Sequence, residues 1–212
     1  MAAVPTDRTT TAIRRYRAHA AGYDAAAART EPLRRRTIAK LALAAGDVVL
    51  DVGCGTGLSF EPIEAQVGPG GRLIGVEQSP EMMARARARV AERGWTNVTL
   101  LEAPIEDVAI PGPVGALLFN FVHDVLQSPR ALARVFAAAA PGARVACQGM
   151  KLFPWWAAPA NLLVLAKARP YMTTFANLAR PWTALAPYVP ALARETTMLG
   201  MGYIVWGAYR PR

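Results

Sequence analysis

Between residues 48 and 150 the hydrophobic positions form short apolar runs, separated by longer segments of mixed character. A short apolar run is typical of a strand buried on both faces, and a longer periodic segment is typical of a helix that covers the sheet. Such an alternation favours a doubly wound parallel sheet in an α/β fold, with helices on both faces. The pattern predicts strands at 48–57 (including a following loop), 72–77, 97–102, 115–122 and 143–150, and helices at 58–67, 80–93 and 128–139.

The two ends of the chain have a different character. Residues 8–28 and 31–45 are expected to be helices, the second entered through Glu31-Pro32, where proline is tolerated in the first turn. Residues 151–192 are rich in proline, aromatic residues and leucine. Two further strands are expected at 193–199 and 202–209. The prediction is therefore one domain over 1–212, with seven strands.

A glycine-rich segment follows the first predicted strand, in the sequence Asp51-Val52-Gly53-Cys54-Gly55-Thr56-Gly57. Glycine lets the backbone approach a ligand closely and adopt a positive φ angle. Glu77 ends the next predicted strand about 20 residues later, at the distance where a carboxylate meets the ribose of a bound nucleoside. The glycine spacing differs from the dinucleotide fingerprint, and no lysine follows that would indicate a triphosphate cradle. A glycine-rich turn without a ligand is the alternative.

This segment resembles the D-x-G-x-G-x-G motif of class I S-adenosylmethionine-dependent methyltransferases, and the resemblance extends from about Tyr16 to Lys151. It implies a Rossmann-like fold ending in an antiparallel hairpin, with S-adenosylmethionine as cofactor. It also implies lid helices at 1–45, a cofactor-binding core at 46–150, an acceptor-pocket insertion at 151–192 and the hairpin at 193–212. The cofactor contacts that it implies are Tyr23, Asp51, Gly53, Cys54, Gly55, Gly57, Glu77, Gln78, Met82, Glu102, Ala103, Pro104, Ile105 and Asn120.

The acceptor side is expected after the fourth predicted strand, where His123 and Asp124 follow one another. Imidazole titrates near neutral pH and suits a general base, so His123 is one catalytic candidate; lining the loop is the alternative. Tyr16 is the second catalytic candidate, because the family's N-terminal helix covers the methionine end. Aromatic residues of the insertion either belong to the core or form walls around a flat acceptor. The expected substrate contacts are Asp124, Met150, Phe153, Trp155, Trp156, Tyr171, Phe175 and Trp182.

Within the family, the insertion resembles that of small-molecule methyltransferases akin to the ubiquinone and menaquinone C-methyltransferases. A fainter resemblance is to enzymes that methylate an indole carbon of tryptophan-derived natural products. The resemblance therefore implies methyl transfer to a small apolar or aromatic acceptor, at carbon, in secondary metabolism. Two alternatives stay open: N-methylation of a phospholipid headgroup, and a non-catalytic cofactor-binding protein.

Composition and charge indicate the class of protein and the partners that can be expected. The 53% of hydrophobic residues is typical of a globular enzyme, and Cys54 and Cys147 alone suggest neither a disulfide framework nor a metal site. The net charge of +9 comes mainly from arginines, and clusters such as Arg34-Arg35-Arg36 are expected to be solvated helix faces. No basic stripe is interleaved with aromatic residues, so nucleic acid is not expected as a partner. Attraction to anionic membrane surfaces stays open.

The first residues lack the apolar stretch of a signal peptide, and no apolar run reaches the length of a membrane span. These observations predict a cytoplasmic protein without stable membrane insertion. The expected partner is a small-molecule acceptor, and a homodimer stays open.

Overall fold

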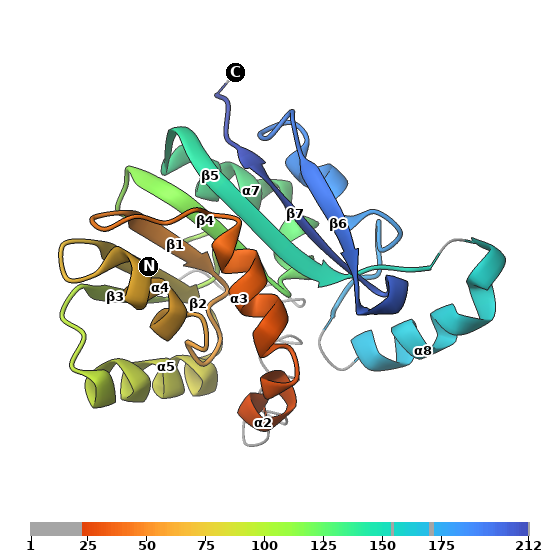
Figure 1. Ribbon diagram of the computed structural model, residues 1–212, viewed down its shortest axis with the longest axis horizontal. Helices are drawn as coiled ribbons and strands as arrows, with labels where there is room; N and C mark the ends of the chain where they lie inside the picture. Colours follow the sequence, from red (N-terminus) through yellow and green to blue (C-terminus); the bar gives the residue numbers. More distant parts are fainter. Residues whose placement is uncertain (1–22, 154, 170–171, 212) are drawn as a thin grey trace.

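A seven-stranded sheet runs through the centre of the molecule (Figure 1) in a computed structural model that describes residues 23–153, 155–169 and 172–211. The strand order is β3-β2-β1-β4-β5-β7-β6. The first five strands in this order pair in parallel, and β7 pairs antiparallel with both β5 and β6. The strands are β1 (Val48–Val52), β2 (Arg72–Glu77), β3 (Val98–Glu102), β4 (Val114–Asn120), β5 (Ala139–Met150), β6 (Ala193–Thr197) and β7 (Gly202–Ala208). The predicted seven-stranded α/β sheet with an antiparallel C-terminal pair is thereby confirmed.

Helices cover both faces of the sheet, as expected for a doubly wound arrangement. The described α-helices are α2 (Tyr23–Ala28), α3 (Glu31–Ala39), α4 (Phe60–Val67), α5 (Pro80–Arg93), α6 (His123–Leu126), α7 (Pro129–Ala137) and α8 (Ala158–Ala168). Short 3-10 helices are η1 (Trp155–Ala157), η2 (Pro181–Leu185) and η3 (Met198–Gly200). None of the helices in the described part of the chain is long and apolar enough to cross a membrane.

The alternation of side chains along β1 divides the core into two layers. Val49 packs with residues of α3, α4 and α5, whereas Leu50 and Val52 pack on the opposite face with residues of α7. On that second face Phe136 of α7 stacks on Tyr188, with 4.1 Å between the ring centroids. Burial on both faces explains why the central strands are continuous apolar runs in the sequence.

Several predicted elements end earlier than expected, and in two of them a residue with positive φ follows the end. The helix expected at 31–45 ends at Ala39, because the chain then turns through Ala42, whose φ is positive, toward β1. The Asp47 carboxylate accepts a hydrogen bond from the Ala44 amide at 2.7 Å and closes this turn. The strand expected at 115–122 ends at Asn120, since Phe121 has a φ of +57°. Both endings depend on single backbone conformations that periodicity does not reveal.

The strand order reverses between β1 and β4, the two neighbours at the centre of the sheet. From β1 the chain proceeds outward to β2 and β3, then returns to β4 and continues on the other side. The loops that leave the carboxyl ends of β1 and β4 therefore diverge to opposite faces and leave a crevice between them. The glycine-rich segment and Asn120 both lie at this edge.

Candidate active site

The loop after β1 depends on glycine for two different reasons. Gly53 has a φ of +67°, and a Cβ placed there would lie 2.6 Å from Cγ1 of Val122. Gly55 has a φ of +58°, but a Cβ there would meet nothing within 4 Å. Gly53 is therefore required by packing against the segment after β4. Gly55 instead faces open space, which is available to a ligand.

Glu77 at the end of β2 holds this loop from the side. Its carboxylate accepts one hydrogen bond from the Gly55 amide at 3.1 Å and another from the Ser79 amide at 2.8 Å. Burial raises the pKa of Glu77, while these backbone hydrogen bonds partly oppose the shift. Each oxygen keeps a further lone pair, so the carboxylate can also accept from a hydroxyl group.

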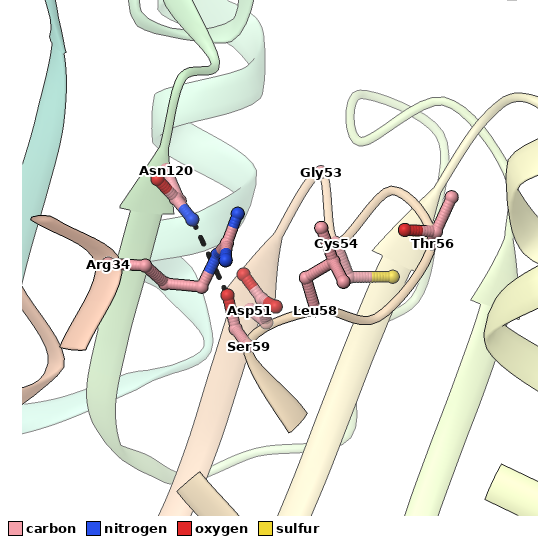
Figure 2. Close-up of a pocket in the computed structure, with 8 residues that line it drawn as sticks. All are labelled: Arg34, Asp51, Gly53, Cys54, Thr56, Leu58, Ser59 and Asn120. Atoms are coloured by element: carbon pink, nitrogen blue, oxygen red, sulfur yellow. Dashed lines mark hydrogen bonds between the residues drawn. The ribbon is translucent and has the colours of Figure 1, made fainter. Parts of the chain in front are cut away.

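A small pocket lies at the switch point between β1 and β4 (Figure 2). The pocket is shallow: about 270 Å³ of empty space lies within it when the open solvent at its mouth is included. The residues that line it are Arg34, Asp51, Gly53, Cys54, Thr56, Leu58, Ser59 and Asn120. The pocket thus brings together four of the predicted cofactor residues and adds four that the sequence did not indicate.

Asp51 and Arg34 are the charged groups of this pocket (Figure 2). Asp51 is 1% exposed, and neither carboxylate oxygen makes a well-aligned hydrogen bond with a described residue, although the nearby Ser59 hydroxyl lowers its pKa. Burial raises the pKa of Asp51 to about 7, and the nearby positive charge of Arg34 opposes this rise. Arg34 is itself only 4% exposed, so the prediction that it lies on a solvated helix face is wrong. Its Nε has no partner among the described residues, and Glu31 accepts a hydrogen bond from Nη1.

A chain of polar side chains supports the β4 side of the pocket. The Asn120 amide donates to Oγ of Ser59 at 3.5 Å, and its carbonyl oxygen accepts a hydrogen bond from Gln148 of β5. Thr37 of α3 donates to Oε1 of Gln148 at 2.9 Å. These contacts link α3, β5, β4 and the glycine loop, so they fix the orientation of Asn120.

The other end of the glycine loop is tied to α2 and α5. Oγ1 of Thr56 donates to Asp24 at 2.6 Å, and Arg89 donates to the Thr56 carbonyl oxygen at 3.1 Å. Arg89 also pairs with the Asp24 carboxylate at 3.1 Å. Asp24 therefore connects the first described helix to the loop.

The predicted adenine side lies along β2, β3 and the segments that follow them. The Ala103 amide donates to the Glu77 carbonyl oxygen at 3.2 Å, which keeps the two strand ends together. Ile105 is 6% exposed and belongs to the core layer that contains Leu50, Val52 and residues of α7. The Glu102 carboxylate pairs with Arg87 at 2.6 Å. Gln78 and Pro104 are half-buried, whereas Met82 is fully buried.

His123 begins α6, directly after β4 and its short loop. The side chain is buried, and neither ring nitrogen makes a well-aligned hydrogen bond with a described residue. Burial lowers the pKa of His123 and favours the neutral ring, although the adjacent Asp124 charge and a hydrogen bond to the Ala176 backbone oppose the shift. His123 is not among the residues that line the described pocket.

Asp124 anchors the insertion. Its carboxylate accepts hydrogen bonds from the amide and hydroxyl of Thr173, at 2.8 and 2.7 Å, and from the Thr174 amide at 3.2 Å. Both carboxylate oxygens of Asp124, which is one of the expected substrate contacts, therefore bind the loop that follows α8.

The described aromatic residues of the insertion take different positions. Trp156 and Phe175 are exposed, and Trp182 packs on Tyr203 with 5.0 Å between ring centroids. Met150 contacts a small cluster of buried residues formed by Met172 and Leu178, and the Phe153 ring abuts Gly200. Tyr16 and Tyr171 lie outside the described residues, and the structure describes Tyr23 and Trp155 by backbone only.

No group of three or more histidine, cysteine, aspartate or glutamate side chains that could hold a metal occurs among residues 23–153, 155–169 and 172–211. Cys54 and Cys147 are both free and buried. Burial raises the pKa of each thiol, which keeps both in the unreactive protonated form.

Comparison with known proteins agrees with this geometry. A family model described as a methyltransferase domain matches residues 49–142, which run from β1 to the turn within β5. The chain is 32% identical over 136 residues to a demethylmenaquinone methyltransferase of Symbiobacterium thermophilum, covering 60% of this chain and 54% of that protein. It is 35% identical over 81 residues to an aklanonic acid methyltransferase of a Streptomyces species, covering 38% of this chain and 36% of that protein.

The fold is similar to that of a S-adenosylmethionine-dependent methyltransferase from Aquifex aeolicus, with a TM-score of 0.62 and 19% identity. That match covers 83% of this chain and 89% of the other. By contrast, the chain spans about half the length or less of the curated relatives described above.

Proposed function

We propose that this chain is a class I S-adenosylmethionine-dependent methyltransferase and that it transfers the methyl group of S-adenosylmethionine to a small apolar acceptor. One observation carries the proposal. At the switch point of the sheet, a buried carboxylate and a buried guanidinium, Asp51 and Arg34, both have unpartnered polar atoms beside a glycine loop.

Unpaired buried polar groups are costly unless a ligand completes them. The methionine part of S-adenosylmethionine is a zwitterion, with one ammonium and one carboxylate. The Asp51 carboxylate fits the ammonium, and the Arg34 guanidinium fits the carboxylate. Asn120 and Ser59, oriented by their hydrogen-bond chain, supply further polar atoms on the same wall.

The remaining predicted cofactor contacts fit the nucleoside. Glu77 has lone pairs left for the ribose hydroxyls, after its bonds to the Gly55 and Ser79 amides. The open space beside Gly55 leaves room for the ligand. Ala103, Pro104 and Ile105 follow β3 and supply an apolar surface for the adenine.

When bound, the cofactor supplies a methyl group that its sulfonium has already activated. The chain therefore has to position the acceptor and accept any proton that leaves it. A neutral His123 at the carboxyl end of β4 can accept that proton at a ring nitrogen, because the Ala176 backbone can engage at most one of the two nitrogens. Tyr16 is the second candidate for this role.

The acceptor class rests on the relatives and on the insertion. One relative is named for demethylmenaquinone and another for aklanonic acid. We therefore place the acceptor among small apolar or aromatic molecules of secondary metabolism that are methylated at carbon, an indole carbon being one such site. The proposed partners exclude nucleic acid, and the proposed location is the cytoplasm.

N-methylation of a phospholipid headgroup is the second candidate. The net charge of +9 favours it, together with the exposed leucines of α8, because both suit an anionic lipid surface. A cofactor-binding protein without catalysis is the third. Release of S-adenosylhomocysteine with an acceptor panel distinguishes turnover from binding alone.

Calorimetric titration with S-adenosylmethionine tests the proposal directly. The wild-type protein should bind, and Asp51→Asn and Arg34→Met should each weaken binding by about tenfold or more, the usual cost of losing a charged hydrogen bond. Asp107→Asn is the matched control, because Asp107 is an exposed aspartate paired with Arg130. Wild-type protein that does not bind, or unchanged affinity in both site variants, would contradict the assignment.

A further inference from the structure

Helix α8 presents an apolar face that no described residue covers. Its outer positions Pro159, Leu162, Leu163 and Ala166 are exposed, and they follow the i, i+3, i+4, i+7 spacing of one helical face. Leu162 is 72% exposed and Leu163 is 52% exposed, while Trp156 in the preceding turn is 71% exposed. Single exposed apolar residues are ordinary, but a continuous stripe of them usually marks a binding surface.

The opposite side of α8 is already packed. Val164 is fully buried, and Leu165 packs with the cluster formed by Met172 and Leu178. The Asn161 side chain accepts a hydrogen bond from the Phe153 amide at 2.7 Å and holds the helix to the end of β5. The helix is thus apolar on both its packed side and its outer side, unlike α7, whose outer face carries the exposed Arg130 and Arg134.

The positive charge of the segment around α8, residues 151–194, favours a negatively charged partner. From residue 151 to 194 the chain contains no aspartate or glutamate. The basic residues in the same interval are Lys151, Lys167, Arg169, Arg180 and Arg194. Leucine and tryptophan side chains with basic neighbours are typical of helices that lie in the interface of an anionic bilayer.

The length of α8 limits how it can meet a bilayer. Its 11 residues extend over about 16 Å at 1.5 Å per residue, whereas a hydrocarbon core is about 30 Å thick. The helix is therefore too short to cross and can only lie along the surface. Figure 1 shows α8 projecting beyond the end of β5, away from the sheet, so the body of the protein does not obstruct such an approach.

We propose that the α8 face, defined as Trp156, Pro159, Leu162, Leu163 and Ala166, docks this protein on an anionic membrane surface. The parallel strands β1, β4 and β5 end at the same edge of the sheet, and α8 follows β5. Docking therefore brings the carboxyl-end edge of the sheet, where the candidate active site lies, toward apolar molecules dissolved in the bilayer. Only this last point, the source of the acceptor, rests on the proposed function.

A second copy of the chain fits this face less well. In a twofold dimer the same surface meets itself, so the acid-free segments of both copies would lie together. Like charges would then face each other without counter-charges from the partner segment. An anionic bilayer supplies those counter-charges instead.

Co-sedimentation with phospholipid vesicles tests the docking. Wild-type protein should sediment with vesicles that contain phosphatidylglycerol and much less with phosphatidylcholine alone, and added salt should weaken the binding. Leu162→Glu with Leu163→Glu should lower partitioning by about tenfold or more, because two leucine side chains lose their apolar burial. Both leucines are exposed, so the melting temperature should change little.

Ala84→Glu with Ala88→Glu is the matched control. Both alanines are exposed on α5, and the pair adds the same two negative charges far from α8. This variant should bind vesicles within about threefold of wild type, since surface charges act over roughly a Debye length. Equal loss in both variants would attribute binding to net charge and overturn the role of the α8 face.

Two other outcomes also overturn the proposal. One is wild-type protein that does not co-sediment with anionic vesicles. The other is sedimentation velocity showing a wild-type dimer that Leu162→Glu with Leu163→Glu dissociates, which would make the face an interface between copies. Calorimetry with S-adenosylmethionine on the same preparations keeps the two proposals separate. Protein that binds the cofactor but not the vesicles contradicts only the docking proposal. Protein that binds the vesicles but not the cofactor contradicts only the proposed function.

Discussion

The Glu77 carboxylate accepts a hydrogen bond from the Gly55 amide at 3.1 Å, so the residue proposed to hold the ribose also holds the glycine loop. Its other oxygen accepts from Ser79 at the start of α5. One carboxylate therefore joins the loop after β1 to the turn after β2. Loss of this side chain changes the shape of the site as well as one of its contacts.

Glu77→Ala should reduce S-adenosylmethionine affinity by about 10- to 100-fold, from a charge-assisted hydrogen bond worth about 1.5–3 kcal/mol. It should also lower the melting temperature, because the Gly55 and Ser79 amides lose their acceptor. Calorimetry and thermal unfolding measure the two effects. Glu92→Ala, at an exposed position of α5, should change neither. Normal affinity in Glu77→Ala would remove Glu77 from the cofactor site.

Gly53→Ala should mainly lower stability, whereas Gly55→Ala should mainly weaken cofactor binding. Each introduces a Cβ at positive φ, at a cost of about 1–2 kcal/mol. At Gly53 the Cβ also collides with Val122, so the main effect should be a lower melting temperature. At Gly55 the Cβ enters free space, so the main effect should be weaker cofactor binding. Equal melting temperatures with equal affinities would contradict this assignment of roles.

Asp51 should make both stability and cofactor binding depend on pH. Its pKa is about 7 in the folded protein, against about 3.9 in an unfolded chain. Between these values the folded protein keeps a proton that the unfolded chain has released. The free energy of unfolding should therefore fall as pH rises from about 4 to 7. Asp51→Asn should flatten this slope in denaturant titrations at several pH values, whereas Asp107→Asn should not.

Cofactor affinity should follow the opposite trend. An ammonium group binds the ionised form of Asp51, so affinity for S-adenosylmethionine should rise as pH increases through about 7. Calorimetry across this range gives the slope. An affinity that is independent of pH in the wild-type protein would show that Asp51 does not meet the ammonium.

His123→Ala should lower turnover by about 100-fold or more while cofactor affinity stays near normal, as expected for a general base. His123→Gln is the matched variant, because it keeps a polar side chain without a titrating ring. Burial lowers the pKa of His123, so the ascending limb of the pH–rate profile should lie below 6.5 in wild type and vanish in both variants. Turnover close to wild type would leave His123 as a residue of the loop, with Tyr16 as the next candidate.

The sheet could be predicted from the sequence because its evidence is local. Each central strand is an apolar run, and the helix starts at Ser79 and Ser128 carry side-chain caps that accept from the Met82 and Ala131 amides. The glycine loop could be predicted for the same reason. A strand, a turn and the acid that follows lie within one short segment of the chain.

The polar wall of the pocket could not be predicted, because its members come from distant segments. Arg34 reads as one of three adjacent arginines, and only packing of α3 against the carboxyl end of β1 buries it. Thr37, Gln148 and Asn120 are linked by hydrogen bonds across 111 and 28 residues of sequence separation. Nothing in the local pattern distinguishes these residues from ordinary polar positions. The role of Asp124 was missed for the same reason, since Thr173 lies 49 residues away.

The contact among Asp24, Thr56 and Arg89 shows that the structure supporting the glycine loop extends beyond the region that the family model matches. The family match begins at residue 49, yet the Thr56 hydroxyl finds its acceptor in α2, 32 residues earlier. A protein trimmed to the matched region would keep every residue of the motif. The buried Thr56 hydroxyl and the Arg89 guanidinium would nevertheless lose Asp24 as their partner. Boundaries for expressing this domain should therefore be chosen by hydrogen-bond partners, and they should include Asp24.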